Sequence, residues 1–279
     1  MKIFFIGDIM GAPGRQAVAG LLHKVVDQYN IDVVVANGEN ASGGMGITPE
    51  VAEQLFQLGI DVITTGNHVW KHKEIQAYLD STDRILRPAN YPEGTPGRGL
   101  TIIETASGEP AAILNLEGRI FMSPLDCPFR TADRELAGLT KDIKVILVDM
   151  HAEATSEKIA LGWYLDGRAS AVIGTHTHVQ TADERILPQG LGYLTDAGMT
   201  GPMDGVIGMD RQVILTRFLS QLPQKFKVAG QNIQLQGVVL DIAEDGKCRE
   251  LVRIRMNLHE NGGKGKGKKA SLAICRPFS

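Results

Sequence analysis

Hydrophobic residues in this chain fall into short runs rich in branched side chains, and several of these runs end close to a glycine. The clearest runs span residues 3–6, 32–36, 61–64, 145–150 and 171–173. Apolar runs this short, bounded by turn residues, predict buried strands. Segments with helical periodicity lie between them, at residues 18–26, after Thr48 and Pro49, at 71–79 and at 156–165. Strands that alternate with helices predict an α/β fold with a largely parallel sheet.

Other parts of the chain add less regular elements. Strands are expected over residues 99–104, 111–116, 192–195, 233–242 and 248–256, with a helix over 212–219. Alternating residues on both sides of 244–246 predict an antiparallel hairpin. Residues 88–110 are rich in proline and glycine, which indicates a loop-rich crossing between two halves of the fold. Residues 121–130 have no clear period, so we expect a long connection whose apolar side chains favour a homo-oligomer.

The composition is that of an ordinary globular protein, with 279 residues, 43% hydrophobic and 22% charged, and a net charge of −3. This charge gives no electrostatic reason to expect binding to nucleic acid or to a membrane. No apolar stretch is long enough to span a bilayer, and the apolar start at residues 1–6 is too short for a signal peptide. The three cysteines are an odd number without close pairing, which is typical of a reducing compartment. We therefore expect a cytoplasmic protein.

The chain changes character at about residue 258. Residues 1–258 carry the predicted strands and helices and are expected to form one domain. Residues 259–279 are expected to form a flexible basic tail, because residues 261–269 are almost entirely glycine and lysine. Such a segment cannot bury apolar area. A solvated tail is the simpler interpretation, and a basic arm that touches RNA is the alternative.

Polar side chains that can bind metal ions follow the predicted strands, at the point where each strand ends. They are Asp8, Glu39, Asn40, Asn67, His68, His151, His176 and His178. Ordinary turns favour asparagine and aspartate but do not repeatedly require glutamate and histidine. Because the carboxyl ends of parallel strands lie along one edge of a sheet, we expect these side chains to meet there. The glycines at positions 7, 11 and 14 lack the spacing of a dinucleotide-binding turn, so we reject that interpretation.

The chemistry of these side chains favours a catalytic metal site over a structural one. Oxygen and imidazole ligands without a thiolate are typical of iron, manganese or zinc in such sites. A carboxylate between two cations can bridge them, and Glu39 is placed to do so. Two metal ions roughly 3.5–4 Å apart can clamp a phosphoryl group and hold a hydroxide for in-line attack. Positive charge is needed there because phosphate esters repel anionic nucleophiles.

Five short motifs carry a resemblance to a known family. They are Gly7-Asp8-Ile9-Met10-Gly11, Asn37-Gly38-Glu39-Asn40, Gly66-Asn67-His68, Asp149-Met150-His151-Ala152-Glu153 and Gly174-Thr175-His176-Thr177-His178. In this order they resemble the calcineurin-like metallophosphoesterases, and more narrowly the bacterial YmdB-type phosphodiesterases. The resemblance covers about residues 1–258. It implies a four-layer α/β sandwich of two mixed sheets flanked by helices. It also implies two divalent or trivalent metal ions, with iron first and manganese or zinc as alternatives.

The resemblance also implies a role for each motif residue. Asp8, Asn40 and His178 would hold the first metal ion. Asn67, His151 and His176 would hold the second, and Glu39 would bridge the two. His68 would be the general acid that protonates the leaving oxygen. The chain departs from the wider superfamily at Met10, where a histidine is usual, and at Glu39 and Asn40, where aspartates are usual. The narrower branch shares these departures.

The branch implies hydrolysis of cyclic nucleotides, in both the 2′,3′ and the 3′,5′ form. A regulatory role in RNA turnover, through RNA-processing partner proteins, is also implied. A phosphomonoesterase or 5′-nucleotidase on the same site is one alternative, and a non-enzymatic regulator that contains metal is another. The complete ligand set together with His68 argues against the regulator, because a protein without turnover does not need the acid.

Three further residues have open interpretations. Glu153 either orients the ring of His151 by a hydrogen bond or begins the next helix. His72 either faces the site or lies on an exposed helical surface. Arg119 either meets a phosphate or makes a surface ion pair.

Overall fold

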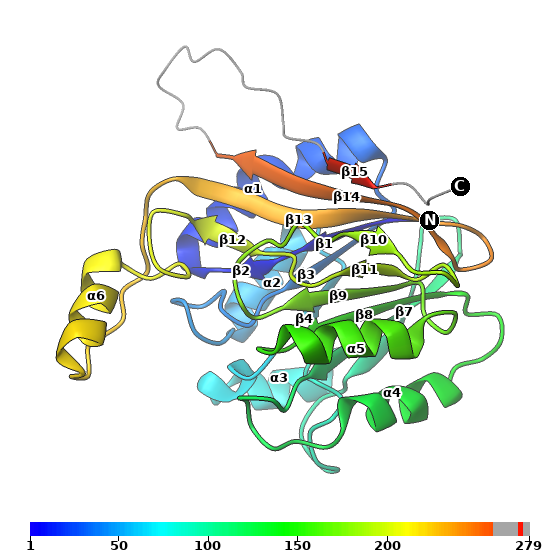
Figure 1. The fold of residues 1–279 in the computed structure, drawn as a ribbon, viewed down its shortest axis with the longest axis horizontal. Helices are drawn as coiled ribbons and strands as arrows, with labels where there is room; N and C mark the ends of the chain where they lie inside the picture. The colour runs from blue at the N-terminus through cyan, green and yellow to red at the C-terminus, as the bar shows by residue number, and fades with distance from the viewer. Residues whose placement is uncertain (259–272, 276–279) are drawn as a thin grey trace.

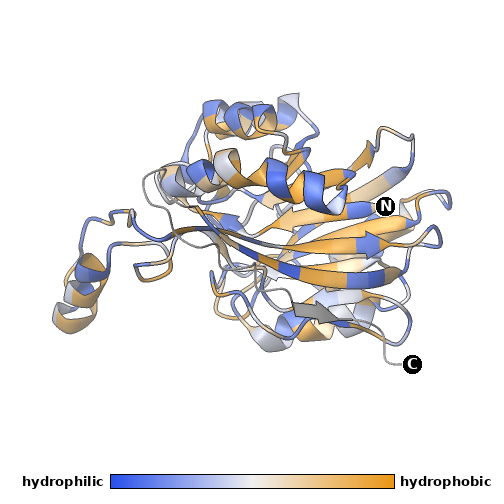
Figure 2. Ribbon diagram, turned by 90° about the horizontal axis from the view of Figure 1, so that it is seen from above, coloured by the Kyte–Doolittle hydropathy of each residue, from blue (hydrophilic) through white to orange (hydrophobic). Residues whose placement is uncertain are grey.

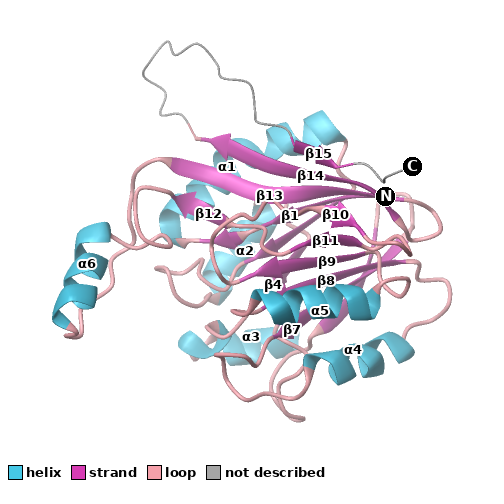
Figure 3. Ribbon diagram, in the orientation of Figure 1, coloured by secondary structure: helices cyan, strands magenta, loops and turns pink. Residues whose placement is uncertain are grey.

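The computed structural model describes residues 1–258 and 273–275. Most of the segment expected as a tail lies outside these residues. The helices are α1 (Gly11–Tyr29), α2 (Pro49–Gln57), α3 (Ile75–Ser81), α4 (Pro128–Ala137), α5 (Thr155–Leu165) and α6 (Arg211–Ser220), with a 3₁₀ turn η1 (Val69–Lys71). They alternate with strands through most of the chain (Figure 3), which confirms the predicted α/β class.

The first sheet has nine strands in the order β15-β14-β13-β1-β3-β4-β5, with β12 and β2 attached beside β13. Their bounds are β1 (Lys2–Ile6), β2 (Asp8–Ile9), β3 (Val33–Asn37), β4 (Val62–Thr64), β5 (Ile85–Leu86), β12 (Met199–Pro202), β13 (Ile233–Ile242), β14 (Cys248–Asn257) and β15 (Ala273–Cys275). Strands β1, β3, β4 and β5 are parallel, so their carboxyl ends lie on one side. The predicted hairpin is the antiparallel pair β13 and β14. The short strand β15, within the segment expected as a tail, pairs with β14.

The second sheet has six strands in the order β10-β11-β9-β8-β7-β6. Their bounds are β6 (Leu100–Glu104), β7 (Pro110–Glu117), β8 (Val145–His151), β9 (Ala171–Thr175), β10 (Arg185–Ile186) and β11 (Gly192–Leu194). The four central strands are parallel, and β6 and β10 are antiparallel edges. This mixture of parallel and antiparallel pairs in both sheets agrees with the fold that the resemblance implies.

Three apolar cores hold four layers together. The first lies between the nine-stranded sheet and α1, α2 and α3. The second lies between the two sheets, and the third between the six-stranded sheet and α4 and α5. Helices therefore cover the outer face of each sheet, and the strands at the centre are strongly hydrophobic (Figures 1 and 2). The implied four-layer sandwich is confirmed.

Strand β1 shows why the apolar runs in the sequence are continuous. Phe4 and Ile6 pack in the first core, against helices. Ile3 and Phe5 point the other way, into the core between the sheets. A strand buried on both faces has no polar face to alternate with, so its sequence reads as an unbroken hydrophobic run.

The last helix, α6, stands apart from the four layers (Figure 1). Ile214 is its buried residue, and it packs with Met10, Met199 and Met209 in a small separate cluster. Phe218 and Leu219, by contrast, are 69% and 86% exposed. We call residues 203–228, which carry α6 and its two connections, the α6 arm. The arm connects β12 to β13, and its Met209 and Ile214 pack on Met10, which directly follows β2.

Two expected segments differ from the sequence prediction. The predicted helix over 71–79 is split, because His72 has an extended backbone between η1 and α3. The long connection over 121–130 ends in a helix, since Pro128 begins α4 with the dihedral that proline fixes at a first helical turn. Phe121 in this connection is 89% exposed. The homo-oligomer expected from that segment stays a prediction. Among the helices of residues 1–258, none combines the length and the apolar character needed to cross a membrane.

Gly174 offers a test of how tightly β9 fits against its surroundings. A methyl group at this position would overlap the carbonyl oxygen of Thr195 and press on the side chain of Lys158. We expect Gly174→Ala to lower the free energy of unfolding by roughly 1–3 kcal/mol, since a packed interior resists added volume. Chemical denaturation measures this change. Gly230→Ala is the matched control, because no atom lies within 4 Å of its added methyl group. Equal stability of the two variants would refute the close fit.

Candidate metal centre

The candidate ligands converge at a place where the two sheets meet. Strands β1, β3 and β4 of the first sheet lead to Asp8, to Glu39 and Asn40, and to Asn67 and His68. Strands β8 and β9 of the second sheet lead to His151, and to His176 and His178. The expectation of one shared sheet edge is therefore wrong. The carboxyl ends of two sheets face each other across the site, and each sheet supplies part of it.

Glu39 is the centre of this group and is 1% exposed. Its Oε2 lies 3.2 Å from His151 Nε2 and accepts a hydrogen bond from the His68 backbone at 3.1 Å. Its Oε1 lies 3.1 Å from His68 Nδ1 and accepts from Asn40 Nδ2 at 2.9 Å. Burial alone would raise the pKa of the Glu39 carboxyl, but the two imidazoles outweigh it and hold that pKa well below its usual value.

Two sets of possible ligand atoms share Glu39. In one set, single atoms of Asp8, Glu39 and His178 all lie within 4.8 Å of one another. In the other, single atoms of Glu39, His151 and His176 do so. Asn40 adjoins the first set through His178, at 3.1 Å, and Asn67 adjoins the second through His151, also at 3.1 Å. The structure thus brings together all seven residues expected to bind metal, in the two groups that the resemblance implies.

Each of the three histidines in these sets has one ring nitrogen fixed by an acceptor behind it. His151 Nδ1 lies 2.9 Å from Thr175 Oγ1, His176 Nε2 lies 3.1 Å from Glu153 Oε2, and His178 Nδ1 lies 3.0 Å from the Ile207 carbonyl oxygen. An acceptor at one nitrogen places the proton there and leaves the other nitrogen as a ligand atom. This arrangement is typical of histidines that bind metal ions.

The buried charges also fit metal ions. Asp8 is fully buried, and its Oδ1 makes no hydrogen bond within the described part of the chain. Burial raises the pKa of Asp8, although His178 and His151 oppose this. Burial would lower the pKa of His151, but Glu39 raises it to about 9, whereas burial and His151 lower that of His176 to about 3. A proton must therefore leave His151 before its Nε2 can bind a metal ion, while His176 is already neutral.

The loop after β9 presents its two imidazoles in a strained conformation. His176 and His178 have φ angles of 96° and 63°, which non-glycine residues rarely adopt. A buried ion pair holds this loop: Lys158 Nζ donates to Asp196 Oδ2 at 2.8 Å and to the Thr175 carbonyl at 2.6 Å. The same Asp196 oxygen accepts from the Thr177 backbone and hydroxyl, at 3.1 and 2.7 Å. Thr177 therefore anchors the loop between the two histidines.

A polar layer beneath the ligands joins the two sheets. Asp149, on β8, is fully buried and accepts hydrogen bonds from Thr64 at 2.5 Å, Thr175 at 2.7 Å and Asn37 at 3.0 Å. Burial raises the pKa of Asp149 to about 6, against the lowering effect of His151 and the hydroxyls of Thr64 and Thr175. Gly66 lies in the same layer, and a Cβ there would collide with His151 and Glu39. These contacts explain the glycine before Asn67.

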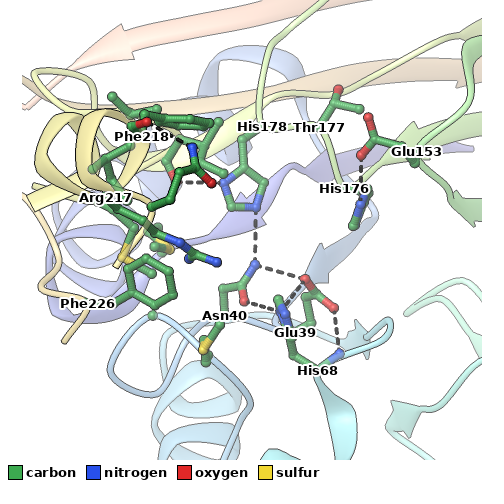
Figure 4. A pocket seen from close by; sticks show the side chains of 18 residues that line it. Glu39, Asn40, His68, Glu153, His176, Thr177, His178, Arg217, Phe218 and Phe226 are labelled. Carbon is green, nitrogen blue, oxygen red and sulfur yellow. Dashed lines mark hydrogen bonds and ion pairs between the residues drawn. The ribbon is translucent and has the colours of Figure 1, made fainter. Parts of the chain in front are cut away.

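A cavity of about 620 Å³ opens above the ligands. Glu39, Asn40, His68, His176 and His178 line one side of it, and the α6 arm lines the other (Figure 4). His68 is partly exposed to this cavity, and its Nδ1 faces two acceptors, Glu39 Oε1 and Asn40 Oδ1, the latter at 2.9 Å. The open interpretations of two residues are resolved. Glu153 contacts His176 instead of His151, and His72 Nε2 faces the Met45 carbonyl at 3.1 Å.

Other residues around the site were not found from the sequence. The pair Lys158 and Asp196 and the α6 arm belong to none of the five motifs, and Asp149 lies within one of those motifs without an implied role. Lys158 lies in an ordinary helix, where a buried lysine is unexpected. The backbone N–H of Arg119 donates to the two carboxylate oxygens of Glu157, at 3.1 and 3.2 Å. Arg119 is not among the residues that line the cavity above the ligands.

A four-layer sandwich with two ligand sets that share a carboxylate defines the chain as a metal-dependent phosphoesterase. The chain belongs to the family of YmdB-like proteins, whose model matches residues 4–254. A relative from Bacillus subtilis (strain 168), named 2′,3′-cyclic-nucleotide 2′-phosphodiesterase, is 52% identical over 254 residues, which is 91% of this chain and 95% of the relative. The family expected from the sequence motifs is confirmed.

Solved structures that share this fold include two with high similarity over most of this chain. A structure described as a hypothetical protein from Thermus thermophilus has a TM-score of 0.87 and 44% identity, and the match covers 92% of this chain and 99% of the other. A structure described as a novel phosphatase from Mycoplasma pneumoniae has a TM-score of 0.86 and 32% identity, with 92% and 93% covered. Both share the fold over almost the whole described chain, and the second is described as a phosphatase.

The buried ion pair beneath the β9 loop makes a prediction. Asp196→Asn leaves a buried lysine without its carboxylate, which destabilises a protein by about 3–5 kcal/mol. Loss of this anchor should also weaken metal binding by about 10–100-fold, as expected when a group that orients ligands is removed. Chemical denaturation and competition with a chelator measure the two effects.

The exposed pair between Lys247 and Asp245, 3.7 Å apart, supplies the control. Asp245→Asn should change neither quantity. The double variant Lys158→Met with Asp196→Asn should recover much of the stability, because it removes the unpaired charge, but it should not recover metal binding. Normal metal binding in that double variant would show that the pair does not position the loop.

Proposed function

We propose that the protein is a dinuclear metal phosphodiesterase that hydrolyses cyclic nucleotides, in the 2′,3′ and the 3′,5′ form. The observation that carries this proposal is the single buried carboxylate, Glu39, shared by two ligand sets at the floor of a cavity. The name of the Bacillus subtilis relative supports the 2′,3′ form as substrate. Cyclic 2′,3′-phosphates are also ends that RNA cleavage leaves, which fits a role in RNA turnover.

The residues that would hold the metal ions follow from the two sets. Asp8, Asn40 and His178 would hold the first ion, and Asn67, His151 and His176 the second, with Glu39 between them. Oxygen and imidazole donors suit iron, manganese or zinc, and we place iron first because the family resemblance implies it. When bound, two such ions supply the positive charge that offsets a phosphodiester anion, and they make water acidic enough to serve as a nucleophile.

His68 is proposed as the general acid. Its Nδ1 faces two acceptors, so that nitrogen carries a hydrogen and the ring is held in one orientation. In the proposed step the ring acts in its doubly protonated form, so that Nε2 has a proton to donate. Water gives up one proton to the solvent as its oxygen bonds to phosphorus, the bond from phosphorus to the ribose O2′ breaks, and the Nε2 proton of His68 goes to O2′. His68 then takes a proton back from the solvent before the next cycle. The product of a 2′,3′-cyclic nucleotide is then the nucleoside 3′-phosphate.

The dinuclear centre predicts a linked loss of metal and activity. Elemental analysis of the wild-type protein should find about two metal ions per chain. Glu39→Gln should retain fewer than one ion and lose cyclic-nucleotide hydrolysis by a factor on the order of 10³, because both sets lose their shared charge. Glu109→Gln, at an exposed glutamate, is the control. Undiminished turnover after complete removal of metal would exclude this mechanism.

A phosphomonoesterase is the second candidate, because the Mycoplasma pneumoniae structure is described as a phosphatase. The same protein samples separate the two functions. A phosphodiesterase should hydrolyse cyclic mononucleotides and bis-p-nitrophenyl phosphate faster than p-nitrophenyl phosphate. The reverse order of rates would establish the monoesterase.

The leaving group tests the role of His68. A poor leaving group such as a ribose oxygen needs a proton, whereas p-nitrophenolate leaves without one. His68→Gln should therefore lower kcat for cyclic nucleotides by about 10²–10⁴-fold. For bis-p-nitrophenyl phosphate the loss should be smaller than about tenfold, with the metal content unchanged. His23→Gln, at an exposed position on α1, is the control. Equal losses on both substrates would remove His68 from the acid role.

A further inference from the structure

The cavity above the metal ligands has a second wall that the proposed chemistry does not use. This wall belongs to the α6 arm and includes Arg217, Phe218, Gln221 and Phe226 (Figure 4). The proposed metal ligands on one side of the cavity would engage only the phosphodiester group of a substrate. A cavity of about 620 Å³ is larger than that group, and it falls in the range of about 300–1,000 Å³ that is usual for sites of small organic ligands. Something beyond the phosphodiester therefore fits between the ligands and α6.

The wall is one face of α6. Ile214, Arg217 and Phe218 line the cavity together with Gln221, and these positions have the spacing i, i+3, i+4 and i+7. Residues with this spacing lie on one side of a helix. Ile214 anchors this side to the methionine cluster, so the other three side chains are presented to the cavity. The opposite side of α6 carries Leu215 and Leu219, which are 49% and 86% exposed and do not line the cavity.

The Arg217 guanidinium lies over the Phe226 ring in this wall. The guanidinium carbon of Arg217 lies 4.9 Å from the centre of the Phe226 ring. The guanidinium group points into the cavity, toward His178 and Asn40 (Figure 4). Bases of nucleotides stack on guanidinium planes as well as on aromatic rings. Phe218 adds a second ring, and it is 69% exposed, which leaves its face free for a ligand.

We propose that Arg217, Phe218 and Phe226 form a nucleobase subsite, so that the α6 arm selects nucleoside cyclic phosphates over simple phosphodiesters. This proposal rests on the proposed function, because it deepens the choice of substrate at the same centre. A planar, uncharged aromatic group with polar edges is the ligand that matches a wall of two rings and one guanidinium. A second phosphate would match the guanidinium but would leave both rings against an anion.

The test compares two substrates that differ only in the base. One is adenosine 2′,3′-cyclic phosphate, and the other is methyl riboside 2′,3′-cyclic phosphate, in which a methoxy group replaces adenine. For the metal-loaded wild-type protein, kcat/KM should be at least about tenfold higher with the base, as expected from base stacking. The double variant Arg217→Ala with Phe226→Ala should bring this ratio close to one, through a higher KM for the nucleotide. Its rate on the methyl riboside should not change.

Leu219→Ala is the matched control, since it truncates an apolar side chain of the same helix on the side away from the cavity. It should keep the wild-type ratio, and all variants should keep the wild-type metal content. Equal kcat/KM of the wild-type protein on both substrates would overturn the subsite but support the proposed function. A high ratio that the double variant retains would also overturn the subsite, because another surface would then hold the base. Hydrolysis of neither substrate would contradict the proposed function and, with it, the subsite.

Discussion

The burial of the Glu39 carboxylate between two sheets is the constraint on which the site depends. An unpaired charge in a protein interior is costly, so cations must approach it from close by. Strands of the first sheet bring His68 and Asn40 to it, and β8 of the second sheet brings His151. The contacts of Glu39 thus cross from one sheet to the other. The two sheets and the candidate metal centre are therefore one structural unit, and neither sheet carries the chemistry alone.

A second constraint acts on the orientation of the imidazoles. The loop after β9 must direct two side chains, separated by one residue, toward the same small volume, and it does so with positive φ angles at both. Such strain persists only where surrounding contacts over-determine the conformation. The pair of Lys158 and Asp196 supplies them from beneath, and Glu153 fixes the outer nitrogen of His176. The four layers therefore position most of the ligands, while the α6 arm fixes His178 through the Ile207 carbonyl oxygen and shapes the other side of the cavity.

The sequence predicts the strand ends well because their signals are local. A doubly buried strand needs a continuous apolar run, and the polar residue after it stands out, as Asp8 and Glu39 do. The sheet that a strand joins is not encoded in its local sequence. Strands β1 and β8 lie in different sheets, although the strand pattern predicted one shared sheet edge. The partners Lys158 and Asp196 are 38 residues apart in sequence, and only tertiary contact relates them. The cavity wall on α6 could not be predicted either. Its four residues, Ile214, Arg217, Phe218 and Gln221, line the cavity only because the tertiary structure places the α6 arm beside the ligands.

The most direct test of a dinuclear centre at Glu39 is a crystal structure of the metal-loaded protein, with anomalous scattering recorded at the absorption edge of the bound metal. Two anomalous peaks about 3.5–4 Å apart are expected, with the carboxylate of Glu39 between them. A single peak, or two peaks that do not share Glu39, would contradict a dinuclear centre bridged by this residue.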